Sequence, residues 1–297
     1  MDIISIIKDI QDVDLCEKEP LGVHSTMRVG GVAAVAAFPK SVPALCELIN
    51  ALKDNKIKHA VIGNASNTVF PDGEYDGVII FTKNLKNIAD EGDKIVAECG
   101  VNLIYLSSFA TEKTLSGAEF LSGIPGTVGG AVYMNAGAYG KSVSDIVSLS
   151  KIYLPGGSVA EITNAEHKFA FRKSVFHESG AVVLSTTFAL EHGYRQKISA
   201  VMTEMKEKRS SSQPLGFPSA GSVFLPAGDT PAWKLIDGAG LRGYKFGGAR
   251  VSEKHAGFIV NEGGATAADI KTLVAIIKKA VFEKYGVELK TEIIFIE

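Results

Sequence analysis

Two glycine-containing loops carry residue types that suit the binding of a diphosphate. The first reads Gly63-Asn64-Ala65-Ser66-Asn67, and the second reads Gly123-Ile124-Pro125-Gly126-Thr127-Val128-Gly129-Gly130. Backbone amides and hydroxyl groups in such loops can surround phosphate oxygens. Either loop alone is more often a structural turn than a ligand loop. The pair leaves both interpretations open, a nucleotide-like ligand or two structural turns, and the residues alone name no reaction.

Other chemistry-bearing motifs do not compete with these loops. We expect neither the Rossmann fingerprint Gly-x-Gly-x-x-Gly nor a P-loop in this chain. No His-Glu-x-x-His occurs and the six histidines lack ligand-like spacing, so we expect no catalytic metal. A Gly-x-Ser-x-Gly nucleophile elbow is also absent from the sequence.

Composition indicates an ordinary globular protein. The chain has 297 residues, 46% of them hydrophobic and 22% charged, which favours two or three compact units. With 31 basic and 33 acidic residues it has no basic excess for a nucleic acid. Cys16, Cys46 and Cys99 form no Cys-x-x-Cys pair, so we expect buried thiols in a reducing compartment.

The sequence shows no clear signal peptide and no clear membrane-spanning segment. The first residues carry an early acid and do not resemble a signal peptide, and the longest apolar run, 29–38, is too short to span a bilayer. We therefore expect a cytoplasmic protein with no membrane and no nucleic acid partner.

The elements that must position the loops follow from periodicity. Helices are expected where apolar residues recur on one face, and strands where short apolar runs lie between turn signals. The expected helices are 41–54, 102–112, 194–208 and 269–285, and the expected strands are 60–62, 78–81, 94–99, 148–154, 158–162, 181–190 and an alternating segment 287–296.

Between these elements, residues 117–140 contain seven glycines in an apolar context. Dense glycine in such a segment implies close approach to another chain segment or to a ligand. Short strands, helices and hairpin signals together predict an α+β fold. We place the main domain boundary near residue 200, with a first unit 1–200 (subdomains about 1–82 and 83–200) and a second domain 201–297.

Several sequence blocks, in order, resemble the UDP-N-acetylenolpyruvoylglucosamine reductase family. The resemblance runs from about residue 20 to the C-terminus and is strongest in Ser122–Ala131 and Asn135–Gly140. Further matching blocks are His24–Gly31, Gly63–Asn67, Phe171–Phe176, Pro218–Phe224, Leu235–Asp237, Gly240–Gly243, Gly247–Ala249, Val251-Ser252 and His255–Asn261.

This resemblance implies a two-part FAD-binding unit of the vanillyl-alcohol-oxidase type, followed by a smaller α+β substrate-binding domain. It implies FAD as cofactor, NADPH as reductant and UDP-N-acetylglucosamine enolpyruvate as substrate, in peptidoglycan precursor synthesis. We expect a monomer. The implied cofactor-binding residues are Arg28, Gly63, Asn64, Ala65, Ser66, Asn67, Gly123, Ile124, Pro125, Gly126, Thr127, Gly129, Gly130, Asn135, Gly137, Ala138 and Tyr139.

The resemblance also implies a catalytic group of three. Ser222 would donate a proton to carbon, Arg172 would hold the substrate carboxylate, and Glu292 would lie near the enol oxygens. Arg209 would contact the substrate diphosphate, together with Arg172 and Ser222 as substrate-binding residues. Without the resemblance, each of these has a plain structural alternative: a backbone-bonded serine, a surface ion pair, a solvated strand face and a cation at a helix C-terminus.

Departures from the family pattern are few. Ala65 stands where the family usually has glycine, and Leu225-Pro226-Ala227 stands where it has a basic residue, then Asn or Arg, then Pro. There is no room for the tyrosine-bearing insertion of one subtype, so the chain resembles the shorter subtype. Two other functions remain open: a related flavin oxidase, and a nucleotide-sugar-binding regulator without catalysis.

Overall fold

The computed structural model describes residues 2–297, which form two compact units. We call them the first unit and the second unit. The first unit contains residues 2–17, Val35–Asn64 and Gly77–Arg209, and the second contains Lys18–Ala34, Ala65–Asp76 and Ser210–Glu297. Helices and strands are mixed in both, which agrees with the expected α+β class.

Near the N-terminus, a four-stranded sheet has the strand order β1-β2-β5-β3. Its strands are β1 (Val13–Pro20), β2 (Val32–Pro39), β5 (Glu74–Phe81) and β3 (His59–Ile62), and the helices of this region are α1 (Ile3–Ile7) and α2 (Val42–Asp54). The helix predicted over 41–54 is confirmed. The Ser41 hydroxyl accepts a hydrogen bond from the amide of Ala44 at 3.3 Å and so caps α2.

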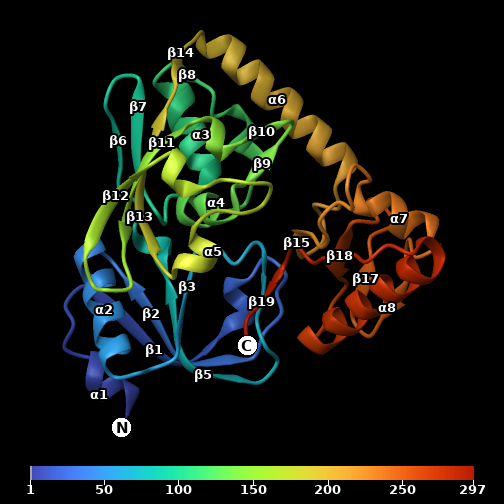
Figure 1. The fold of residues 1–297 in the computed structure, drawn as a ribbon, viewed down its shortest axis with the longest axis horizontal. Helices are drawn as coiled ribbons and strands as arrows, with labels where there is room; N and C mark the ends of the chain where they lie inside the picture. The colour runs from blue at the N-terminus through green and yellow to red at the C-terminus, as the bar shows by residue number, and fades with distance from the viewer. Residues whose placement is uncertain (1) are drawn as a thin grey trace. The chain divides into compact units, whose positions relative to one another are not determined.

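A five-stranded antiparallel sheet forms the centre of the first unit (Figure 1), in the order β12-β11-β13-β7-β6. The strands are β6 (Ile88–Asp90), β7 (Lys94–Glu98), β11 (Val147–Tyr153), β12 (Val159–Thr163) and β13 (Val182–Ala189). The predicted β11–β12 hairpin is confirmed. Helix α3 (Leu103–Glu112) belongs to the same hydrophobic core, and α4 (Val128–Met134) packs on β13 and β7.

The glycine-rich segment 117–140 folds into several short elements. They are η3 (Glu119–Gly123), α4 and a small hairpin of β9 (Gly137–Ala138) with β10 (Lys141–Ser142). Gly129 approaches another chain segment: a Cβ there would lie 3.0 Å from the Cβ of Cys99, and its amide donates to the Cys99 carbonyl at 2.8 Å. This glycine is therefore required for packing.

Helix α6 (Arg195–Ser212) confirms the helix predicted over 194–208, but the apolar residues on its one face are only partly buried. Ile198 is buried, whereas Val201 is 39% exposed. Within residues 2–297, no helix is both long and apolar enough to cross a membrane. The remaining short elements of the chain are η1 (Leu21–His24), η2 (Thr82–Asn84), η4 (Val143–Asp145), η5 (Ala165–His167), α5 (Phe176–Ser179), β8 (Leu115–Ser116) and β14 (Glu191–His192).

The second unit is built around a four-stranded sheet with the order β15-β18-β17-β16. Its elements are β15 (Ser219–Ser222), β16 (Lys245–Phe246), β17 (Ala249–Val251), β18 (Phe258–Asn261), α7 (Ala232–Gly238) and α8 (Ala267–Tyr285). Helix α8 confirms the prediction over 269–285: Thr266 and Asp269 form a capping box, and Gly286 ends the helix with φ 67°.

The C-terminal segment corrects one expectation. We predicted a continuous strand over 287–296, but only β19 (Ile294–Phe295) is a strand, parallel to β4 (Thr68–Val69). The segment changes its pairing partner: the amide of Glu292 donates to the Val223 carbonyl, and that of Ile294 donates to the Asn67 carbonyl. Alternating side chains are therefore compatible with two short pairings instead of one ladder.

One run of residues matches the letters of the Rossmann fingerprint. Gly238-Ala239-Gly240-Leu241-Arg242-Gly243 begins at the last residue of α7. The fingerprint requires a strand before it and a helix after it. The expectation that no such run occurs is therefore wrong, but this run ends a helix instead of opening one.

A buried hydrogen-bonded chain crosses the five-stranded sheet at His167. The ring Nδ1 lies 2.7 Å from the Thr163 carbonyl, and Nε2 lies 2.9 Å from the Ser150 hydroxyl, which in turn lies 2.9 Å from the hydroxyl of Thr186. His167 is fully buried, and this burial lowers the pKa of its ring below the ordinary 6.5. The folded protein therefore holds His167 neutral.

The unfolded chain binds a proton at His167 more readily than the folded protein does. Protonation of His167 therefore does not lower the free energy of unfolding above about pH 6.5, and lowers it increasingly as the pH drops below that value. We expect His167→Gln to weaken this acid dependence, by at most about 1.4 kcal/mol per pH unit. Urea unfolding between pH 7.5 and 5 measures the difference. His192→Gln, at an exposed position, is the control. Equal pH profiles for wild type and His167→Gln would contradict the assignment.

Candidate functional site

Gly63 and Asn64, which begin the first loop, meet the second loop within the first unit. The amide nitrogen of the Asn64 side chain donates to the Pro125 carbonyl at 2.6 Å. Gly63 lies against Thr127, so closely that a Cβ at position 63 would overlap the threonine hydroxyl. The structure thus joins two glycine loops that are far apart in the sequence.

The first loop has the backbone conformation of an anion-binding turn. Ala65 has φ 43°, in the left-handed region. None of the hydrogen bonds of residues 2–297 uses the amides of Asn64, Ala65 or Ser66 as donors. Consecutive free amides next to a left-handed residue form a concave donor set that suits phosphate oxygens.

A cation lies over the second loop. The Cδ of Arg209 would be 2.8 Å from a Cβ on Gly123, so the arginine side chain occupies the space that a larger residue there would take. Arg209 is half-buried, and burial lowers the pKa of its guanidinium. A partly desolvated cation is stabilised by an anion, which is consistent with a phosphate nearby.

The segment 135–139 makes its own contacts within the first unit. Asn135 ends α4 in the left-handed conformation, with φ 43°, and its side chain donates to the Ala170 carbonyl at 2.9 Å. Gly137 and Ala138 form the first strand of the β9–β10 hairpin, and the Tyr139 hydroxyl donates to the Met205 carbonyl of α6 at 2.6 Å.

Arg172 sits at the tip of a tight turn in the first unit. Ala170 and Lys173 exchange both backbone hydrogen bonds, and Arg172 between them has φ 55°. Its guanidinium lies 5.0 Å from the ring centroid of Phe171 and donates from Nη2 to the Gly137 carbonyl at 3.2 Å. A left-handed non-glycine residue is strained, and such strain is concentrated at functional sites.

Ser222 is the last residue of β15 in the second unit. The β15–β18 pairing shifts register between Ser219 and Ser222, and Gly221 in this bulge has φ 78°. Bulges re-aim the side chains that follow them. Among residues 2–297, no side-chain hydrogen bond is made by the Ser222 hydroxyl.

Glu292 is held on the neighbouring backbone of the same unit. Its amide donates to the Val223 carbonyl at 2.8 Å, and its carbonyl accepts from the Asn67 side chain at 3.0 Å. Because Val223 follows Ser222 in the chain, the backbone segments that carry Ser222 and Glu292 are adjacent. The amide nitrogen of the Asn67 side chain is the donor in the contact with the Glu292 carbonyl.

Arg28 lies in a turn of the second unit that other residues hold in place. It is exposed, with φ 55°, and its amide donates to the Ser25 carbonyl. The Asn261 side chain donates to the carbonyls of Met27, at 3.1 Å, and Arg28, at 3.4 Å. The sequence analysis missed this role of Asn261, although Asn261-Glu262-Gly263-Gly264 has turn chemistry.

Comparisons with known proteins agree with the resemblance seen in the sequence. Residues 213–296 match the family model "UDP-N-acetylenolpyruvoylglucosamine reductase, C-terminal domain", and residues 33–163 match a FAD binding domain. The UDP-N-acetylenolpyruvoylglucosamine reductase of Limosilactobacillus reuteri is 40% identical over 97% of this chain and 97% of its own. The chain belongs to this reductase family.

Further members support the assignment. The Caldanaerobacter subterraneus enzyme of the same name is 42% identical over 93% of this chain and 91% of its own. The crystal structure of the Thermus caldophilus reductase covers 96% of this chain and 99% of its own with a TM-score of 0.81 and 28% identity. The predicted α+β fold, with a FAD-binding part followed by a C-terminal domain of this reductase family, is confirmed.

As a member of this reductase family the chain is a flavin-dependent oxidoreductase, and its loops fit FAD. The FAD binding domain match contains Gly63, Asn64 and all of the segment 123–139. A diphosphate needs amide donors, and the joined loops of the first unit carry them. The residues present are therefore suited to hold the dinucleotide.

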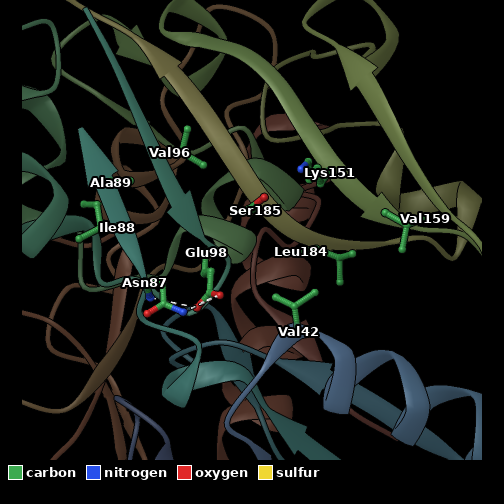
Figure 2. Close-up of a pocket in the computed structure, with 10 residues that line it drawn as sticks. All are labelled: Val42, Asn87, Ile88, Ala89, Val96, Glu98, Lys151, Val159, Leu184 and Ser185. Atoms are coloured by element: carbon green, nitrogen blue, oxygen red, sulfur yellow. Dashed lines mark hydrogen bonds between the residues drawn. The ribbon is translucent and has the colours of Figure 1, made fainter. Parts of the chain in front are cut away.

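A separate pocket of about 340 Å³ lies elsewhere in the first unit. Figure 2 shows its wall of side chains from the five-stranded sheet, with Val42 of α2 at one edge. Asn87 and Glu98 bond to each other there, with the Asn87 side chain donating to Glu98 at 2.9 Å. None of the predicted site residues lines this pocket.

Groups that could hold a metal are not assembled in the described structure. Within residues 2–297, no three His, Cys, Asp or Glu side chains come together as a potential ligand set. Cys99 is buried, and burial raises the pKa of its thiol to about 12, so it stays protonated.

Ala65 permits a test of the loop conformation. Because glycine adopts positive φ freely, Ala65→Gly relieves about 1 kcal/mol of strain, which offsets the added freedom of the unfolded chain. We expect the free energy of unfolding, measured in urea, to change little. Ala51→Gly, inside helix α2, is the matched control and should lose about 1 kcal/mol. Equal losses for both variants would mean that Ala65 is not strained.

Proposed function

We propose that the protein reduces UDP-N-acetylglucosamine enolpyruvate to UDP-N-acetylmuramate with NADPH, as a cytoplasmic step of peptidoglycan precursor synthesis. The observation that carries the proposal is the 40% identity to a reductase of this name over 97% of both chains. FAD, when bound, supplies a carrier that accepts a hydride from NADPH and delivers it to substrate. The net change adds that hydride to one carbon of the enol double bond and a proton to the other.

Arg172 is proposed to bind the carboxylate of the enolpyruvyl group. Hydride addition moves negative charge toward this carboxylate, so a fixed cation there stabilises the transition state. The planar guanidinium matches a carboxylate in two parallel hydrogen bonds, which a lysine does not provide. Stacking on Phe171 and the bond to the Gly137 carbonyl support its orientation.

Ser222 is proposed to donate the proton to carbon. A serine hydroxyl is a weak acid, so it must be placed on the reacting carbon and aided by neighbouring groups. Its position after the Gly221 bulge, with no hydrogen bond to another described side chain, leaves the hydroxyl available for substrate.

Glu292 is proposed to act beside Ser222, near the enol oxygens. Two backbone-anchored contacts, to Val223 and Asn67, fix the position of this residue in the second unit. Asn67 is proposed to hold this segment while Asn64, Ala65 and Ser66 offer amides to the cofactor diphosphate. Arg209, beside Gly123 of the second loop, is proposed to contact the substrate diphosphate.

Ser222→Ala separates the two half-reactions. We expect reduction of the bound flavin by NADPH to continue at its normal rate, while reduction of the enolpyruvyl nucleotide falls by about 10²-fold or more. Stopped-flow absorbance follows the first half-reaction and product formation follows the second.

Ser219→Ala, in the same strand, is the matched control and should leave both half-reactions unchanged. Turnover of Ser222→Ala equal to that of Ser219→Ala would exclude Ser222 as the proton donor.

A further inference from the structure

Both polar atoms of the Asn135 side chain make hydrogen bonds inside the first unit. Its Nδ2 donates to the Ala170 carbonyl at 2.9 Å, and its Oδ1 accepts from the Ser144 amide at 3.1 Å. The residue is 7% exposed. Both ends of the amide are therefore engaged by protein, which conflicts with the expected role of Asn135 as a cofactor ligand.

The segment that contains Asn135 clamps the turn that carries Arg172. The Ser174 hydroxyl donates to the Tyr133 carbonyl at 2.6 Å, and Arg172 itself donates to the Gly137 carbonyl at 3.2 Å. Asn135 lies between these two contacts in sequence. Three points of one segment therefore fasten one turn.

The Asn135 contact is the one that fixes where the turn begins. The Ala170 carbonyl accepts from the Asn135 side chain and also from the Lys173 amide at 3.1 Å, which closes the two-residue turn around Arg172. Arg172 is held at φ 55° in this turn. A strained conformation persists only where the surroundings over-determine it, and the Asn135 amide is part of those surroundings.

The chemistry of position 135 requires asparagine in particular. The backbone there has φ 43°, which asparagine and glycine tolerate best. Of these two, only asparagine also offers a donor and an acceptor on a short side chain. One residue thus ends helix α4 and reaches across to the Arg172 turn.

We propose that Asn135 is a positioning residue for Arg172 in the reduction of the enolpyruvyl group, and that it does not bind the cofactor. The proposal rests on the proposed role of Arg172. Asn135 acts on the second half-reaction only, because it touches neither the joined loops nor Arg209.

Two variants remove the contact in different ways. Asn135→Gly keeps the positive φ and deletes the amide, and Asn135→Asp keeps an acceptor for the Ser144 amide but, when ionised, has no donor for Ala170. For both we expect kcat for the enolpyruvyl nucleotide to fall about tenfold, since small misplacement of a catalytic group has effects of this order. FAD affinity and the rate of flavin reduction by NADPH should stay at their wild-type values.

Asn164→Ala is the matched control. The Asn164 side chain donates to the carbonyls of Ser144 at 2.9 Å and Val147 at 2.7 Å, so it shares the residue Ser144 with Asn135 but makes no hydrogen bond to residues 170–173. It removes two hydrogen bonds of a similar kind, so a general loss of stability would appear in this variant as well. We expect its kcat to equal that of the wild type.

A double-mutant cycle with Arg172→Lys decides the route of action. If Asn135 works through Arg172, Asn135→Gly lowers kcat in the wild type but adds little in the Arg172→Lys background. Independent effects that multiply, or weaker FAD binding with unchanged kcat, would overturn the proposal. Full activity of Arg172→Lys alone would remove the proposed role of Arg172, and with it this inference, before any Asn135 variant is made.

Discussion

The contact between the two glycine loops is the constraint on which the proposed cofactor site depends. Asn64 donates to the Pro125 carbonyl, and the absence of a side chain at Gly63 lets Thr127 come close. These contacts bring the end of strand β3 to the segment just before α4. A dinucleotide needs hydrogen-bond donors that converge from several chain segments, and this contact brings two such segments together.

The same part of the first unit also controls the proposed catalytic arginine. Helix α4 begins at the loop that meets Gly63 and ends at Asn135, whose amide holds the Arg172 turn. The second proposed cofactor loop therefore lies at the start of this short helix, and the residue that bonds to the Arg172 turn lies at its end. In the second unit, the adjacent backbones of Ser222 and Glu292 are fixed by pairing with Val223 and Asn67.

Apolar periodicity in the sequence predicted helices that the structure shows to be capped. Helix α2 has Ser41 and helix α8 has Thr266 with Asp269, and both begin within two residues of the predicted start. The C-terminal segment was predicted as one strand, because alternation reports which side chains share a face but not which segments pair with them. Its switch from Val223 to Asn67 is a tertiary feature.

The candidate site shows the same limit. Residue types and resemblance selected the loops, Arg172, Ser222 and Glu292, but nothing in the sequence showed that Asn64 meets Pro125, since 61 positions separate them. Asn135 was selected as a cofactor residue because its block matches the family. Only the structure shows that its side-chain amide hydrogen-bonds to the backbone of Ala170 and Ser144.

The central claim is that this chain holds FAD and passes reducing equivalents to the enolpyruvyl nucleotide. The most direct measurement is the visible absorbance of the purified protein without oxygen, first after NADPH and then after UDP-N-acetylglucosamine enolpyruvate. We expect a flavin spectrum that NADPH bleaches and that the nucleotide restores. A colourless protein that does not take up FAD, or a bleached flavin that the nucleotide leaves unchanged, would contradict the account.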